Sequence, residues 1–113
     1  MNNMENQSLQ IAKTIQSQLM GLGQMKVWSW GANSWTAIQN GLAFKVQGFK
    51  FKGIVQITLM PSDTYTIQFS KAKMILKEIT DVYFDEMVDI IDEYVEYTGA
   101  NYSNDVNKAV YRF

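Results

Sequence analysis

Apolar and polar residues alternate along the middle of the chain in several short runs, with only a few residues between one run and the next. Leu42, Phe44 and Val46 alternate with small or polar neighbours, and Ile67 and Phe69 do the same. A period of two is typical of strands that bury one face. Because a parallel crossover needs about a dozen residues or more, these connections predict an antiparallel meander. We expect four to six strands within residues 25–79.

Turn residues separate the alternating runs. Asn40-Gly41 is the strongest hairpin signal, because both residue types tolerate the positive φ that a type I′ turn requires. Pro61 opens another turn, which ends at Asp63. Residues 71–79 fit helical spacing about as well as alternation, and we favour a strand there. The runs themselves are residues 25–30, 34–39, 42–47, 49–52, 54–59, 65–70 and 71–79.

One amphipathic helix is expected before the strand region of the sequence and another after it. The first covers about residues 4–20, with Ile11, Ile15 and Leu19 four apart and a stop at Gly21. The second covers about residues 81–98, with Thr80 as its N-cap. Its apolar stripe is Phe84, Val88, Ile91 and Val95, broadened by Met87, Ile90 and Tyr94, and Gly99 ends it. Within the tail, 100–113, residues 109–113 could add an edge strand.

These elements predict a single α+β domain over residues 1–113, in which both helices cover one face of the antiparallel sheet. A chain of 113 residues has room for one hydrophobic core. No apolar stretch is long enough to cross a bilayer, and the N-terminal residues lack the pattern of a secretory signal. We therefore expect a cytoplasmic protein with no membrane partner.

The composition excludes several kinds of chemistry. The chain has no Cys and no His, so it lacks thiolate metal ligands, the Ser-His-Asp triad and the commonest general base. A Ser-Lys pair, a carboxylate pair or a tyrosine base would remain, but no spacing distinguishes such a pair. We expect no enzyme activity, no cofactor and no metal site.

Charge is distributed unevenly along the chain. Residues 1–77 carry eight lysines against Glu5 and Asp63, a net of +6, whereas residues 78–113 carry a net of −7. The acidic residues of the second helix recur three and four apart, which places most of them along one stripe. That stripe could be a solvated face or a docking surface for a basic partner. The candidate docking residues are Asp85, Asp89, Asp92, Glu93 and Glu96.

Two other groups of residues could contact a partner. Trp28, Trp30 and Trp35 are candidate anchors, since tryptophan is frequent at interface hot spots. Lysines interleaved with aromatic residues could bind single-stranded nucleic acid by neutralising phosphates while rings stack on bases. Ordinary packing, with aromatic residues inside and lysines in solvent, explains the same alternation. The lysines concerned are Lys45, Lys50, Lys52, Lys71 and Lys73.

Several short segments, taken in order, resemble a family of small uncharacterised proteins encoded by bacteriophages and prophages. The chain departs from the family pattern at Ser70, where glycine is usual, and in the tail from Ala100. The resemblance implies a phage-type source and a compact fold, and it transfers no catalytic residue. The segments are Gly31-Ala32, Ser34-Trp35, Leu42-Ala43-Phe44-Lys45, Ile57-Thr58-Leu59, Asp63-Thr64-Tyr65 with Ile67, Phe69 and Lys71, Val82-Tyr83-Phe84-Asp85 with Met87, and Thr98-Gly99.

Together these features favour a non-catalytic binding protein of phage type. The sharpest hypothesis is a stoichiometric inhibitor that docks on a host protein or a host defence complex, such as a CRISPR effector, through the acidic helix. The alternatives are a single-stranded nucleic-acid-binding accessory protein that uses the basic sheet, and a small structural component of a virion. A homo-oligomer is compatible with each of these hypotheses.

Overall fold

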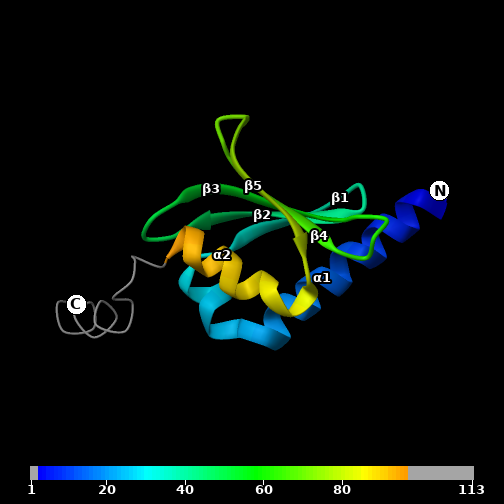
Figure 1. The fold of residues 1–113 in the computed structure, drawn as a ribbon, viewed down its shortest axis with the longest axis horizontal. Helices are drawn as coiled ribbons and strands as arrows, with labels where there is room; N and C mark the ends of the chain where they lie inside the picture. The colour runs from blue at the N-terminus through cyan, green and yellow to red at the C-terminus, as the bar shows by residue number, and fades with distance from the viewer. Residues whose placement is uncertain (1–2, 97–113) are drawn as a thin grey trace.

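In the computed structural model, which describes residues 3–96 and their side chains from residue 6, five strands form one antiparallel sheet. Each strand pairs with the next one along the chain, so the order in the sheet is β1-β2-β3-β4-β5. Both helices lie on the same face of the sheet (Figure 1). The predicted α+β fold is confirmed. In chain order the elements are α1 (Asn3–Ser29), β1 (Asn33–Ile38), β2 (Gly41–Gln47), β3 (Lys52–Leu59), β4 (Tyr65–Lys71), β5 (Met74–Val82), the 3₁₀ turn η1 (Phe84–Glu86) and α2 (Met87–Val95).

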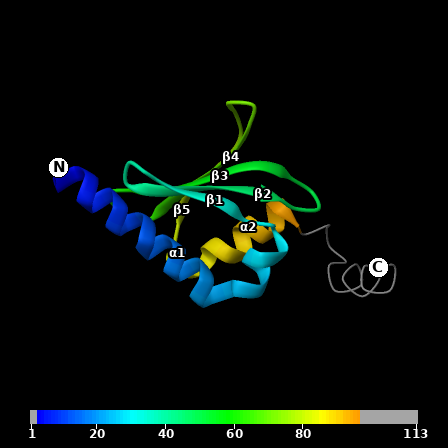
Figure 2. The ribbon, with the colours of Figure 1, turned by 180° about the vertical axis from the view of Figure 1, so that it is seen from behind.

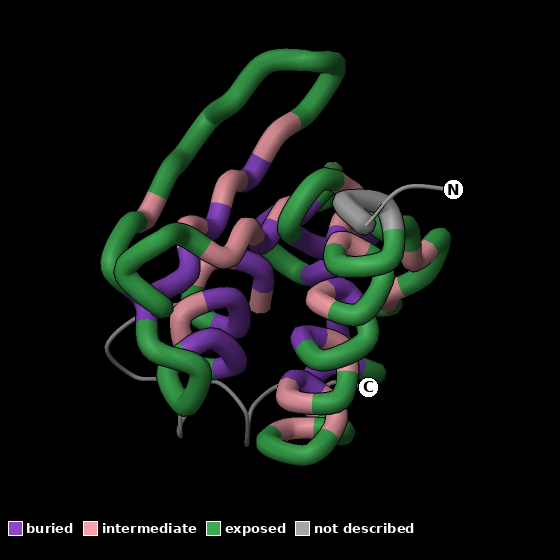
Figure 3. Tube along the Cα trace, turned by 90° about the vertical axis from the view of Figure 1, so that its right-hand side faces the viewer, coloured by how far each residue is buried: buried purple, intermediate pink, exposed green. Residues whose placement is uncertain are grey.

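The core lies between the sheet and the helices, where Figure 3 shows the buried residues of both layers. The pairing register brings Phe44 beside Val55 and Val55 beside Phe69, so these residues line one face together. Ile15 of α1 and Ile91 of α2 are fully buried against this face. The alternation predicted for β2 and β4 is confirmed, since Leu42, Phe44, Val46, Ile67 and Phe69 are all buried.

Among the described elements, no helix lies on the opposite face of the sheet, here called the helix-free face, and this face is polar. Gln56 pairs with Gln68 and Thr58 with Thr66 across the central strands. The amide of Gln68 also donates a 2.7 Å hydrogen bond to Glu78 on β5. A polar face of this kind is typical of an antiparallel sheet with one side in water.

Helix α1 is longer than the sequence pattern predicts, and this overturns the expected strand at residues 25–30. The helix passes through Gly21 and bends at Gly23, the one residue of α1 with non-helical dihedral angles (φ −162°, ψ 54°). Val27 and Trp30 are both buried, and residues three apart face the same side of a helix but opposite sides of a strand. Figure 2 shows the bend and the returning segment from behind.

The expected strand at residues 49–52 is a turn as far as Phe51, and only Lys52 belongs to β3. The amide N–H groups of Lys50 and Phe51 both donate to the carbonyl oxygen of Val95, at 2.7 and 3.3 Å. The last carbonyls of a helix have no partner within the helix. The turn therefore satisfies the end of α2 instead of extending the sheet.

The start of the second helix also differs from the prediction. Thr80 is not an N-cap but part of β5, which continues to Val82, a buried residue paired with Tyr65. Asp81 has a positive φ of 57° at an irregularity in this pairing. Phe84, expected in the apolar stripe, is half exposed in η1. Because β5 continues to the buried residue Val82, the second helix begins several residues later than the sequence predicts.

Residues 71–79 form most of a hairpin, which confirms the strand interpretation for residues 74–79. Ala72 and Lys73, both with positive φ, make the two-residue turn between Lys71 and Met74. The β1–β2 turn is centred on Gln39-Asn40 rather than Asn40-Gly41, and only Asn40 has a positive φ. The predicted stop at Gly99 and edge strand at 109–113 lie outside the described residues.

Candidate functional site

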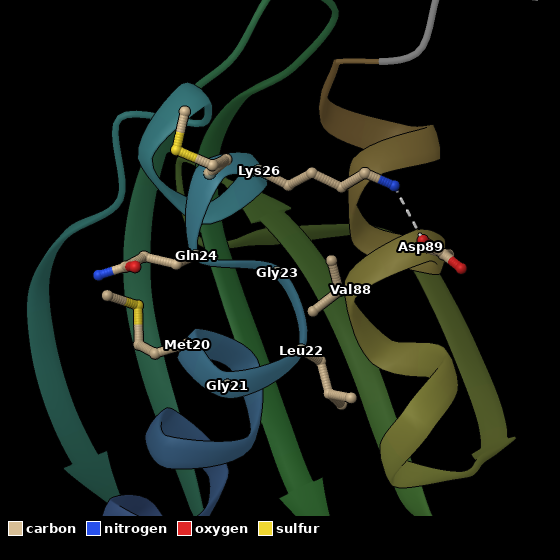
Figure 4. Close-up of a pocket in the computed structure, with 9 residues that line it drawn as sticks. Met20, Gly21, Leu22, Gly23, Gln24, Lys26, Val88 and Asp89 are labelled. Atoms are coloured by element: carbon tan, nitrogen blue, oxygen red, sulfur yellow. Dashed lines mark hydrogen bonds and ion pairs between the residues drawn. The ribbon is translucent and has the colours of Figure 1, made fainter.

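The bend in α1 creates a cleft between the two helices (Figure 4). At Gly23 the backbone of α1 comes so close to α2 that an added Cβ would lie 2.5 Å from Cγ1 of Val88. Beside this contact, Lys26 Nζ forms a 2.9 Å ion pair with Asp89 Oδ1. The cleft has a volume of about 410 Å³. Its lining is Met20, Gly21, Leu22, Gly23, Gln24, Met25, Lys26, Val88 and Asp89.

The helical segment after the bend presents two large apolar side chains to solvent. Met25 is 74% exposed and Trp28 is 60% exposed. They are three residues apart, so they share the helix face that points away from buried Val27 and Trp30. Exposed Met and Trp on one face are typical of a contact surface for another protein.

The three predicted tryptophan anchors have different environments. Trp30 is fully buried, and its indole Nε1 donates a 3.0 Å hydrogen bond to Asp92 Oδ1. Trp35 is half-buried, with its ring centroid 4.5 Å from that of Phe44. Of the three, only Trp28 is largely exposed.

The five predicted acidic residues do not form one exposed face. Asp92 is only 5% exposed and accepts the Trp30 hydrogen bond inside the core. Asp89 is exposed but paired with Lys26. Asp85 and Glu93 are exposed on η1 and α2. The remaining residue, Glu96, is half-buried and accepts a 3.2 Å hydrogen bond from the Phe49 N–H.

Burial at the end of α2 changes the acidity of Glu96. Desolvation raises the pKa of this carboxyl above its ordinary value of 4.5, and the charge of Asp92 raises it further. The hydrogen bond from Phe49 opposes this shift without cancelling it. Burial likewise raises the pKa of Tyr65, whose hydroxyl donates to Gln18, so this phenol stays protonated and is no base at neutral pH.

The predicted nucleic-acid lysines are spread over several surfaces. Lys45 and Lys52 lie on the helix-free face of the sheet, opposite their buried neighbours. Lys50 lies in the β2–β3 turn and donates to the carbonyl oxygen of Glu93, at 2.7 Å. Lys71 and Lys73 belong to the projecting β4–β5 hairpin.

The aromatic residues of these strands lie on the other face. Their rings are covered by the helices, so they offer no platform on which a base could stack. The exposed exception nearby is Phe49, whose side chain is 66% exposed in the β2–β3 turn. The buried set comprises Phe44, Phe51, Tyr65 and Phe69.

Within residues 3–96, no three carboxylates come together as a metal site requires. Neither α1 nor α2 is long and apolar enough to cross a membrane.

No protein family, no curated protein and no solved structure matches this chain. The candidate site therefore rests on its own geometry.

Proposed function

We propose that the protein is a non-catalytic binding protein that docks stoichiometrically on another protein. The observation that supports this proposal is the exposure of both Met25 and Trp28 on the helical segment after the bend. A tryptophan ring provides a large rigid contact area, and methionine adapts to the shape of the facing surface. Trp28 is the central anchor in this proposal.

Charge supports a basic partner. The exposed carboxylates of Asp85 and Glu93 lie in the same helical layer as the anchor, whereas that of Asp89 is paired with Lys26 of the anchor segment. Rim charges of one sign speed association with a partner of opposite sign. The partner surface is thus an apolar pocket bordered by lysine or arginine.

The resemblance to phage-encoded proteins supports a host protein as the partner, reached in the cytoplasm of the host cell. Host proteins that handle nucleic acid, including defence complexes, carry the basic surfaces that this arrangement would fit. Binding alone is sufficient for such a protein to act as an inhibitor.

Quantitative affinity capture tests the proposal. Tagged full-length protein, Trp28→Ala and the equally exposed control Phe49→Ala are each incubated with host extract, and the captured proteins are quantified by mass spectrometry. The partner is then purified. We expect Trp28→Ala to weaken its affinity by about 30-fold or more and Phe49→Ala to change it less than about threefold. Light scattering should give a complex of fixed stoichiometry.

Two results would contradict the proposal. One is an equal effect of both substitutions on binding of the partner. The other is tight binding of a labelled single-stranded oligonucleotide whose affinity falls steeply between low and moderate salt, which would favour the nucleic-acid alternative.

A further inference from the structure

Among the described elements, strand β5 is an edge of the sheet. It is the last strand in the sheet order and, among the described elements, it pairs only with β4. In a strand at an edge, every second residue directs its N–H and C=O groups outward, where they can pair with another chain. The pairing of β5 with β4 is regular at Lys77, Glu78 and Ile79, with an irregularity on either side. This three-residue stretch is the best template that β5 offers.

A groove runs beside this template, between β5 and α2. Its volume is about 500 Å³, and its apolar lining is Ile79, Ile90 and Tyr94. The Tyr94 ring is held firmly, since its centroid lies 4.1 Å from that of Phe69 and 5.1 Å from that of Phe51. An apolar groove beside a free edge is the arrangement that accepts an extended peptide as an added strand.

The charges around the groove favour an acidic ligand. Lys50 and Lys77 line it together with Glu93. Glu78, the acidic residue of the template, accepts a hydrogen bond from Gln68 on the helix-free face. Further out, Lys71 precedes the hairpin turn and Lys73 lies in it, and both are exposed. Asp81 is the acidic residue at the other end of β5. Within the groove itself, two lysines face one carboxylate.

We propose that the β5 edge and this groove bind an extended acidic segment of a partner protein by strand addition. The backbone of the segment pairs with residues 77–79, and every second side chain of the segment faces the groove. Among these groove-facing side chains, apolar ones contact Ile79 and Ile90, and acidic ones, two residues away along the segment, contact Lys50 and Lys77. This inference rests on the proposed function only for its premise that the protein acts by binding another protein.

A designed peptide tests the inference with the full-length protein. The probe is a fluorescein-labelled, capped octapeptide, Thr-Val-Thr-Asp-Thr-Val-Thr-Asp, which places valine and aspartate in turn on one face of a strand, and binding is followed by fluorescence anisotropy. We expect saturable binding, and binding about tenfold weaker for the matched peptide with lysine in place of aspartate. In a peptide bound as an added strand, only every second amide N–H pairs with β5. N-methylation of the amides that pair should weaken binding about tenfold or more, while methylation of the amides that point away has little effect.

Substitutions on the protein locate the site. Lys77→Glu should weaken binding of the acidic peptide about fivefold or more, whereas Lys45→Glu, on the helix-free face, leaves it unchanged. Equal effects of the two substitutions, equal effects of the two methylated sets, or no saturable binding would overturn the inference. Backbone hydrogen bonds between β5 and residues 97–113 would also overturn the inference, because the groove would then be filled by this chain. Self-association that Lys77→Glu abolishes would overturn it too, because the groove would then be filled by a second copy.

The two proposals can fail separately. If the acidic peptide does not bind but capture of the partner still depends on Trp28, only the strand-addition site is overturned. If the peptide binds at β5 but capture of the partner does not depend on Trp28, only the helical anchor is overturned.

Discussion

The indole Nε1 of Trp30 donates a hydrogen bond of 3.0 Å to Asp92 Oδ1, and this contact joins the end of the α1 region to α2 inside the core. Both residues are buried, and 62 positions separate them in the sequence. An acidic residue of the predicted docking stripe is therefore a structural link. Because the link is buried, removing one partner leaves the other without a hydrogen bond.

Asp92→Ala should lower the free energy of unfolding by about 1–3 kcal/mol, because the buried indole N–H loses its acceptor. Asp92→Asn keeps a carbonyl oxygen at the same position and should cost less. Urea denaturation of both variants measures the difference. Equal losses would mean that the hydrogen bond contributes little and that the charge or the packing of Asp92 matters instead.

Two glycines two residues apart in α1 should respond in opposite directions to alanine. A Cβ at Gly21 meets open space, so Gly21→Ala should stabilise the protein by about 1 kcal/mol through helix propensity. A Cβ at Gly23 collides with Val88, a stiff β-branched residue, so Gly23→Ala should destabilise it by about 1–3 kcal/mol. Thermal unfolding with the double variant Gly23→Ala/Val88→Ala gives the check: its loss should be smaller than the sum of the single losses.

The ion pair between Lys26 and Asp89 is exposed and should contribute little to the free energy of unfolding. We expect Asp89→Asn to cost about 0.2–1 kcal/mol at low salt and less at high salt, where the charges are screened. Asp85→Asn, at an exposed position of η1, serves as the control. Chemical denaturation at two ionic strengths compares them, and a loss that does not depend on salt would rule out the electrostatic explanation.

Glu96 should make stability depend on pH in a defined direction. Its pKa is raised in the folded state, so the folded protein holds this proton more tightly than the unfolded chain. The resulting stabilisation is complete below the unfolded pKa near 4.5 and is lost as the pH rises through the raised folded pKa. Thermal unfolding of the wild type and Glu96→Gln at several pH values tests this. The variant should gain stability relative to the wild type as the pH rises from 4 to 7 (roughly the range of an ordinary carboxyl titration), and a flat difference would contradict the assignment.

The sequence predicted the central strands well because their alternation repeats the burial of one face. The run from Val27 to Trp30 misled the strand prediction, because an alternation of four residues is too short to distinguish a strand from a helix. The bend at Gly23, rather than a stop at Gly21, depends on Val88 of α2, a contact that no local pattern contains. Short-range patterns therefore placed the layers but not the junction between the helices.

The candidate site was predicted less completely for the same reason. Spacing along α2 put Asp92 in the acidic stripe, but its burial depends on the distant indole of Trp30. Trp28 was identified as an anchor by residue type, yet its exposure follows from the helical segment after the bend. The groove beside β5 had no signal in the sequence, since it lies between two elements that the local pattern treats separately.

The contact between Trp30 and Asp92 also bears on how the protein is made. A ribosome completes α1 and the meander before it adds Asp92, so in the growing chain the indole N–H of Trp30 does not have this partner until α2 is made. The packing between the two helices consequently forms only after α2 has emerged from the ribosome.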